Sequence, residues 1–214
     1  MNIFSYNSPF GRFMNRLVDV ILLSLLTIIC CLPIITAGAA FSALYYVLLK
    51  MVRDNDNGII RSYFKGFKDN FLKATALWLI VAPVIVIVYL DFYLLSTVAM
   101  DYSDVVKILL LIIGALLLMV GNYIFPMQAQ FENTVWGTLK KAFILSIMNL
   151  PKSLIMLLIM ASPIVILLFF PETVYFLPFF CIAAIPYLKT EILVRIFDQY
   201  MPKETDGEAS GEPE

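Results

Sequence analysis

Two polar side chains, Asp91 and Asn122, interrupt long apolar runs of this sequence. A polar or charged residue inside a membrane-spanning segment is a functional candidate, because lipid does not solvate it. Asp91 lies six residues before the end of its run at Thr97, so it is either a hydrated interfacial carboxylate or a proton- or ligand-linked site. Asn122, with Gln128 and Gln130, can bond neighbouring helices or line a polar vestibule.

No arrangement typical of an enzyme accompanies these residues. The chain contains no histidine, which removes the usual ligand of catalytic zinc and the usual base of a serine triad. It also lacks the glycine-rich phosphate loop, the H-E-x-x-H and G-x-S-x-G motifs and any C-x-x-C pair. We therefore expect a protein that is not an enzyme and that holds no metal or cofactor.

The composition explains why the polar candidates are so few. Of 214 residues, 61% are hydrophobic and 14% are charged, whereas soluble domains contain about 45–50% apolar and about 25% charged residues. A chain of this length cannot hide that excess in a soluble core. The composition excludes a cytosolic enzyme, a disordered protein and a nucleic-acid-binding protein. It predicts an all-α, polytopic membrane protein whose main partner is the lipid bilayer.

The apolar runs predict one transmembrane domain over 1–202, a helical bundle, followed by a disordered acidic tail at 203–214. A spanning helix needs about 20 residues, and most of the runs approach that length. Six helices are expected, near 17–35, 37–52, 74–97, 105–126, 154–170 and 174–195.

The first two runs are expected to form a helical hairpin. As one helix, 17–49 would be about 50 Å long, which exceeds a bilayer core of about 30 Å. Pro33, Thr36 and Gly38 should form the tip, because proline removes a helical hydrogen bond and glycine relaxes the backbone. Whether 37–52 spans the membrane or is re-entrant is open. Gly38 also begins a series of small residues that favours close helix packing, inside the chain or with another one.

The basic residues predict the orientation. With six helices and both termini inside, every lysine and arginine except Lys107 lies on the inner side, as the positive-inside rule requires. A five-helix topology is the alternative, and it moves Arg12 and Arg16 to the outside. Lys189 is expected to anchor the last helix by reaching to the membrane surface.

Two amphipathic segments, 59–73 and 135–150, are predicted to be elbow helices in the cytoplasmic interface. The first has an aromatic stripe that includes Phe64 and Phe67, and the second has Trp136 and Phe143. Lysine and arginine flank both stripes, which is the pattern of a helix that lies along a membrane surface.

The two elbows align with each other at an offset of 79 residues, with Asn70 and Lys73 opposite Asn149 and Lys152. This alignment predicts an internal repeat of parallel topology, as found in some transporters; two unrelated interfacial elbows would also look alike. Both asparagines are expected to cap rising helices. All four residues are candidates for a cytoplasmic contact surface.

Several blocks resemble a known family. Residues 12–19, 32–40 and 43–45, the elbow segment 63–71, and the end of the second elbow at 149–151 are similar to the YesL-like family of bacterial membrane proteins. The resemblance implies a membrane protein of unknown function without established site residues. It also implies genes beside carbohydrate ABC importers, polysaccharide-degrading enzymes and sensor kinases.

These observations lead to a functional expectation. The chain should be a non-enzymatic accessory or regulatory component associated with carbohydrate uptake, with an ABC permease, an ATPase or a sensor kinase as partner. The alternative is a small permease with its site between the repeats, and a homo-oligomer is open in either case. The resemblance and the basic residues predict a multi-pass protein of the bacterial cytoplasmic membrane with both termini in the cytoplasm.

Overall fold

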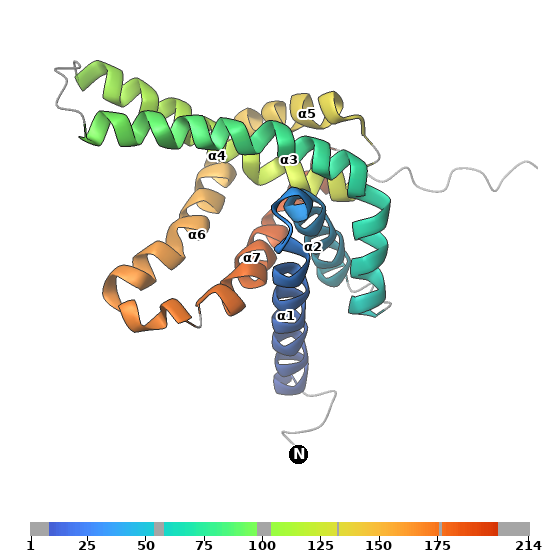
Figure 1. Ribbon diagram of the computed structural model, residues 1–214. Helices are drawn as coiled ribbons and strands as arrows, with labels where there is room; N and C mark the ends of the chain where they lie inside the picture. The colour runs from blue at the N-terminus through green and yellow to red at the C-terminus, as the bar shows by residue number, and fades with distance from the viewer. Residues whose placement is uncertain (1–8, 54–57, 98–103, 132, 176, 201–214) are drawn as a thin grey trace, which may run out of the picture.

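The computed structural model describes residues 9–53, 58–97, 104–131, 133–175 and 177–200 of the chain. All regular secondary structure in these ranges is helical, as predicted (Figure 1). Helices satisfy their own backbone hydrogen bonds, which a chain in lipid requires. The predicted acidic tail at 203–214 lies outside the described residues. In chain order, with η for short 3₁₀ helices, the elements are α1 (Pro9–Cys31), η1 (Ile34–Thr36), α2 (Ala37–Val52), α3 (Ile59–Thr97), α4 (Asp104–Gln130), α5 (Val135–Met148), α6 (Leu150–Phe169), η2 (Pro171–Tyr175) and α7 (Leu177–Tyr200).

The expected hairpin at the start of the chain is present. α1 and α2 are separated by η1, and α2 runs back alongside α1 (Figure 1). The Thr36 hydroxyl lies 2.8 Å from the carbonyl oxygens of both Cys30 and Pro33, and its one proton is shared between these two acceptors, which fixes the tip. At the open end of the hairpin, Arg16 donates to the carbonyl oxygen of Met51 at 3.1 Å.

α3 is a single helix of 39 residues, although the sequence predicts an elbow at 59–73 and a separate span at 74–97. The turn signal precedes the helix, at Gly58 with φ of 84°, and no helix-breaking residue stands between the two predicted segments. Figure 1 shows that the first turns of α3 run in a different direction from the rest. The two segments are therefore parts of one bent helix.

α2 lies at the centre of the molecule and packs closely on α3 through two glycines. A Cβ atom on Gly38 would lie 2.5 Å from Cβ of Trp78, and one on Gly66 would lie 2.7 Å from Cδ1 of Tyr46. These contacts show that α2 and the first part of α3 are antiparallel. The small residue at the start of α2 therefore serves packing within the chain.

The other sides of α2 are covered by α1, α4 and α7. Leu44, Leu48 and Met51 are completely buried as a result. α7 is held to α1 by a hydrogen bond in which the backbone N–H of Ala183 donates to Oγ of Ser24 at 3.2 Å. The buried core of the molecule is thus built around its second helix.

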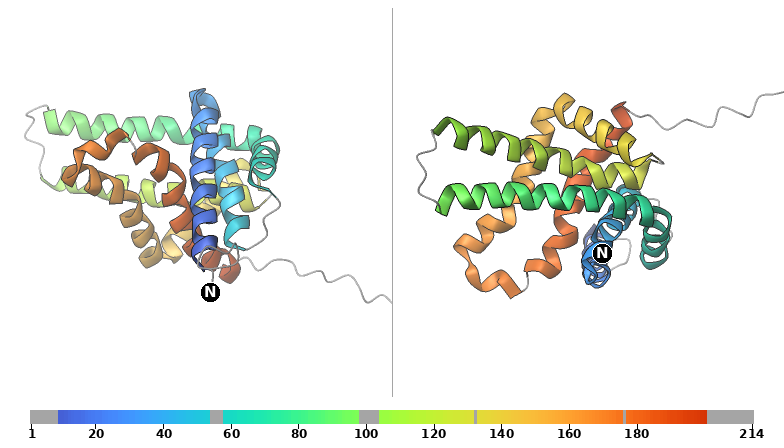
Figure 2. Two further views of the ribbon diagram at one scale, coloured as in Figure 1. Left: turned by 90° about the horizontal axis from the view of Figure 1, so that it is seen from below. Right: turned by 45° about the horizontal axis from the view of Figure 1, so that its top comes forward.

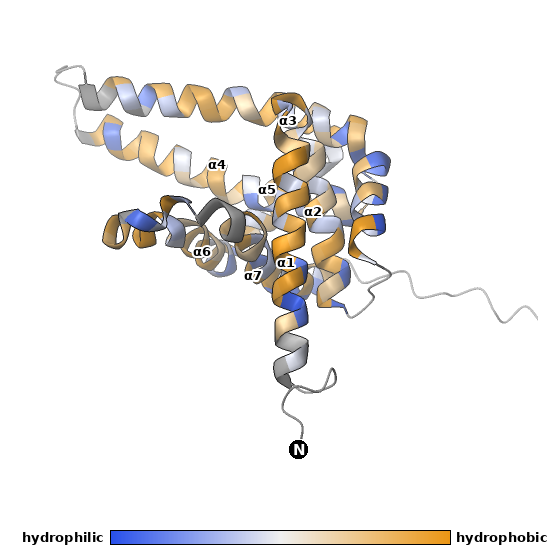
Figure 3. Ribbon diagram, turned by 60° about the horizontal axis from the view of Figure 1, so that its bottom comes forward, coloured by the Kyte–Doolittle hydropathy of each residue, from blue (hydrophilic) through white to orange (hydrophobic). Residues whose placement is uncertain are grey.

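Two arms extend from this centre. The outer parts of α3 and α4 form a hairpin that runs crosswise to α1, and α6, η2 and α7 form a second arm (Figures 1 and 2). Large apolar side chains of the arms point outward; Leu111 is 63% and Leu158 68% exposed. Figure 3 shows mainly apolar residues along α4 and along α1 and α3 beyond their first turns. Such a surface suits contact with lipid and not with water.

Five described helical segments are long and apolar enough to cross a membrane: Met14–Cys31, Ile34–Val52, Ile59–Asp91, Val105–Gln130 and Leu150–Phe169. This number is the lower of the two expected from the sequence. The expected segment that is left out is α7, which carries four charged residues in its second half. The orientation of the chain in the membrane stays a prediction.

Candidate functional site

Three polar side chains lie in the C-terminal part of α4, Asn122, Gln128 and Gln130, and we call this set the α4 polar row. Asn122 and Gln128 are buried and Gln130 is half-buried. Each of the three amides bonds a different neighbour. Buried amides of this kind need partners, because an unsatisfied polar group in an apolar interior is costly.

Asn122 is bonded to Lys189 of α7. The Lys189 ammonium donates to Oδ1 of Asn122 at 2.8 Å, and Lys189 is 6% exposed. Asn122 Nδ2 donates in turn to the carbonyl oxygen of Leu118 at 3.0 Å. The expectation that Lys189 anchors α7 at the membrane surface is therefore wrong. Its side chain points into the protein because Asn122 offers an acceptor between the two helices.

Gln128 joins the two predicted elbows. Its Nε2 donates to Oδ1 of Asn70 on α3 at 3.3 Å, and its Oε1 accepts from the hydroxyl of Thr138 on α5 at 2.9 Å. Gln128 and Thr138 are both almost completely buried. The first turns of α3 and the helix α5, far apart in the sequence, thus meet at one amide of α4.

Gln130 completes the row beside the end of α2. Nη1 of Arg53 donates to Oε1 of Gln130 at 3.0 Å, and Nη2 of Arg53 forms an ion pair with Asp198 of α7 at 2.8 Å. Asp198 is largely exposed, so this ion pair contributes little to stability. The α4 polar row as a whole confirms that its amides bond neighbouring helices. Inter-helix bonds of this kind contribute about 0.6–2 kcal/mol each.

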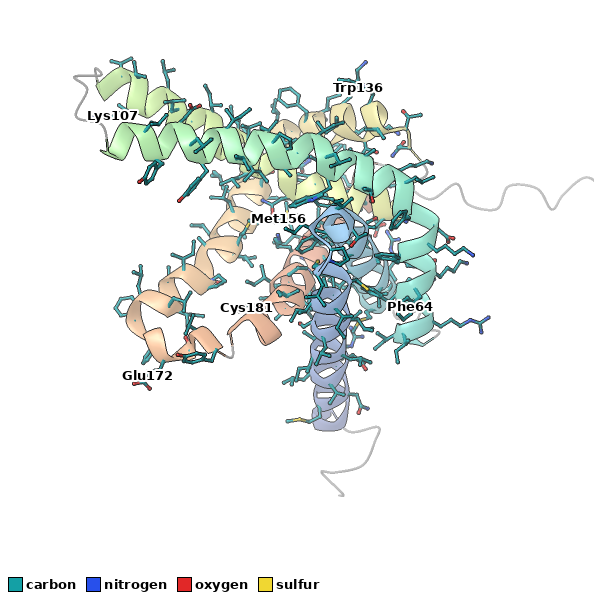
Figure 4. The ribbon with its side chains drawn as sticks, viewed as in Figure 1. Phe64, Lys107, Trp136, Met156, Glu172 and Cys181 are labelled. Atoms are coloured by element: carbon teal, nitrogen blue, oxygen red, sulfur yellow. The ribbon has the colours of Figure 1, made fainter. Side chains whose placement is uncertain are left out.

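Asp91 does not lie with Asn122. Asp91 is six residues before the end of α3, whereas Asn122 is eighteen residues after the start of α4. In an antiparallel hairpin this difference separates them by about 18 Å along the helices. Asp91 is half-buried on the outer arm, the far end of which carries Lys107 (Figure 4). The two residues therefore do not form one polar site.

The first predicted elbow packs with only part of its aromatic stripe. Tyr63 is buried and donates to the carbonyl oxygen of Ala40 at 3.3 Å, and Phe67 is half-buried. Phe64 is 51% exposed, and Lys73 is exposed as well. The other basic residues of this segment, Arg61, Lys65 and Lys68, are all exposed. This segment thus presents a mixed apolar and cationic outer face.

Neither predicted asparagine cap is made by its side chain. Asn70 lies inside α3, where its Nδ2 donates to the carbonyl oxygen of Gly66 at 3.3 Å. Asn149 stands between α5 and α6, at the capping position, but its Nδ2 donates backward to the carbonyl oxygen of Leu145 at 3.4 Å. The capping expectation is wrong for Asn70 because the elbow and the span form one helix. At Asn149 the preceding helix end competes for the side chain.

The second predicted elbow is α5, and its large apolar stripe faces outward. Trp136 is 71% and Phe143 52% exposed, and Trp136 lies on the outer side of α5 (Figure 4). Lys140 and Lys141 are exposed on the same helix. Lys152 follows in the first turn of α6, where its Nζ lies 3.4 Å from Oε1 of Gln199.

The buried face of α5 was missed from the sequence. It consists of Thr138, Ala142 and Leu145, followed by Ser146. A buried pair of hydroxyl groups lies nearby, between Tyr123 and Ser153 at 2.8 Å. Spacings of three and four between small and polar residues signal this face, because such residues favour helix contacts in lipid.

Metal chemistry has no evident site in the part of the chain that the structure describes. Within it, no group of three or more Cys, Asp or Glu side chains is placed to hold a metal ion. The three cysteines are free and half-buried. The side chains of the α4 polar row form hydrogen bonds that join α4 to other parts of the chain.

The helices and the outward apolar surface define a multi-pass, all-α membrane protein. Residues 18–92 match a family described as "Protein of unknown function, DUF624". This stretch contains the whole hairpin tip and the whole first elbow. The chain is also 25% identical over 158 residues to "Uncharacterized protein YteU" of Bacillus subtilis (strain 168), covering 73% of this chain and 69% of that protein. No solved structure matches the chain significantly.

Proposed function

We propose that this protein is a non-enzymatic accessory component of a bacterial carbohydrate-uptake system, acting on an ABC importer or its sensor kinase through the two elbow segments. The observation that carries the proposal is the junction at Gln128. It brings the first turns of α3 and the helix α5 together at one end of the molecule. A surface made from two distant segments suits a contact with another subunit.

The use of the interior polar groups supports the same proposal. The three amides of the α4 polar row bond Lys189, Asn70, Thr138 and Arg53 of the same chain. Groups engaged in helix contacts are less available for a substrate, which favours an accessory role over a permease. The carbohydrate connection rests on the resemblance to the YesL-like family alone.

Photocrosslinking in living cells tests the proposal. A photoreactive residue is placed at Arg61 or Lys65, both exposed on the first elbow, and at Leu158 as a control on the outward face of α6. In the native host grown on plant polysaccharide, we expect adducts to a permease, an ATPase or a sensor kinase from the two elbow positions only.

Two results would overturn the accessory role. Adducts that form equally from Leu158 would show that the elbows have no special contact. Recovery of the protein alone or only as a homo-oligomer would favour a permease, for which liposome flux with wild type and Asp91→Asn is the next measurement.

A further inference from the structure

The position of α5 in the chain places it at a membrane surface. It connects α4, which ends at Gln130, with α6, which begins at Leu150, and both contain candidate spans. The connection is short, and α5 itself takes up 14 residues of it. When two successive helices both cross a bilayer, the second begins on the side where the first ends. The end of α4, the helix α5 and the start of α6 therefore lie at the same membrane surface.

The contacts of α5 fix which face it turns outward. Thr138 is bonded to Gln128 at 2.9 Å, and Ala142 and Leu145 are buried in the core with the last turns of α4. α5 therefore folds back along the end of α4 instead of extending away from it. The opposite face is left to the surroundings, with five large apolar side chains that are 44–71% exposed: Trp136, Phe143, Ile144, Ile147 and Met148.

This apolar face is continuous with the surface expected to meet lipid. Leu150 begins α6, where Leu154 is 53% and Leu158 is 68% exposed in turn. Lipid that covers α6 will therefore also reach α5. A Trp at this level is typical of the membrane–water interface, where its ring has both apolar and polar surroundings.

The charges on α5 specify the kind of lipid. Lys140 is exposed, four residues after Trp136 and three before Phe143, so it lies on the outward face. Lys141 is exposed beside it, and its Nζ is oriented by Oδ1 of Asn133 at 2.7 Å. The sequence from Asn133 to Pro171 contains no acidic residue, so no carboxylate in this stretch offsets the two charges.

We propose that α5 is a binding site for anionic phospholipids: its apolar face enters the headgroup region, and Lys140 and Lys141 bind lipid phosphates. A basic residue near an anionic surface favours binding by about fivefold. The proposal does not depend on the accessory function, because it needs no protein partner. The first elbow differs, since Tyr63 and Gly66 of its sequence are buried against α2 and an acidic residue, Asp69, is exposed on it.

The depth of Trp136 can be measured directly. The chain has two tryptophans, Trp78 and Trp136, so the full-length Trp78→Phe variant reports on α5 alone. It is reconstituted in phosphatidylcholine vesicles that contain lipids brominated near the headgroup or deep in the chains. We expect the shallow bromines to quench Trp136 more strongly. If Trp78→Phe does not fold, the difference between wild type and Trp136→Phe gives the same signal.

The lipid preference is measured in mixtures of phosphatidylglycerol and phosphatidylcholine in which one of the two is brominated. We expect brominated phosphatidylglycerol to quench Trp136 severalfold more than brominated phosphatidylcholine, and added salt to reduce this preference. Lys140→Gln/Lys141→Gln should abolish the preference. The matched control, Lys65→Gln/Lys68→Gln on α3, should leave it unchanged.

Three outcomes would overturn the proposal. Quenching of Trp136 by aqueous iodide but not by brominated lipid would place α5 outside the bilayer and leave its face for a protein. Equal quenching of Trp136 by the two brominated lipids would show that α5 has no preference for anionic lipid. An equal effect of both lysine pairs would show a general charge effect and no site on α5.

Discussion

α2 and α6 are both apolar helices long enough to cross a membrane, yet their surroundings are opposite. About two thirds (67%) of the α2 segment is buried within the protein, against 11% of the α6 segment. α2 nevertheless has the lowest mean hydropathy of the five candidate spans. The more apolar helix is therefore the more exposed one, which is the reverse of the rule for soluble proteins.

The difference follows from the side chains of the two helices. α2 begins with small residues at 37–40 and has Ser42 and Ala43 after them, so neighbouring helices can approach its backbone. α6 is rich in leucine, isoleucine and methionine. In lipid no hydrophobic force draws these large side chains inward, and helices associate by close packing and hydrogen bonds instead. The centre and the arms of this molecule should thus respond differently to the same substitution.

The largest contrast is expected for the buried ammonium. Asn122→Leu removes the hydrogen-bond acceptor of Lys189 and should lower the free energy of unfolding by about 3 kcal/mol or more, because it leaves a buried, charged donor without its acceptor. The measurement is denaturant unfolding of the purified protein in mild detergent. Asn122→Leu/Lys189→Met is the control, and it should recover most of the loss because the charge is gone. A double variant as unstable as the single one would show that Lys189 is not held by Asn122.

Which of these contacts the sequence can predict depends on whether the signal is local. The hairpin tip at Pro33 and Thr36 is predictable because proline acts on its own backbone. The expectation that Gly38 belongs to the tip is wrong, because Gly38 lies inside α2 and packs on α3. The inward side chain of Lys189 is not predictable, because its acceptor is on another helix and 67 residues away in sequence. The same holds for Asn70, whose capping role depends on a helix start that the structure does not have.

Exchanging a leucine tests the comparison more directly. Leu44→Ala in the fully buried part of α2 should lower the free energy of unfolding by about 2–5 kcal/mol, through lost contacts and the cavity left behind. Leu158→Ala on α6, where Leu158 is 68% exposed, should cost less than about 1 kcal/mol because detergent or lipid fills the space. Equal losses at both positions would mean that α6 is also packed against protein.

α5 shows why the inward face of an amphipathic helix is harder to predict than the helix itself. The stripe from Trp136 through Phe143 identifies an amphipathic helix, as the sequence predicts. It is the Thr138, Ala142 and Leu145 face, however, that contacts α4. The pattern of hydrophobic residues is enough to find such a helix in the sequence. Only the distribution of small and polar side chains indicates which face turns inward.

The smallest expected contrast concerns two glycines. Gly38→Ala should cost about 1–3 kcal/mol, because its Cβ would lie 2.5 Å from Cβ of Trp78 and would force α2 and α3 apart. Gly121→Ala on α4 is the control, since nothing lies within 4 Å of the added atom, and it should leave stability unchanged or slightly higher. Thermal unfolding in detergent measures both. A neutral Gly38→Ala would show that α2 and α3 can separate without cost.

The central place of α2 also has a consequence for how the protein is made. α2 is synthesised second, before α3, α4 and α7, which cover most of its surface. Chains fold from the N-terminus as they emerge, so the new α1–α2 hairpin first enters the membrane with its small-residue surface facing lipid. We expect this hairpin to remain loosely associated, and accessible to quality-control proteases, until α7 has been translated. Correct assembly of this protein is then decided only after α7 has been translated.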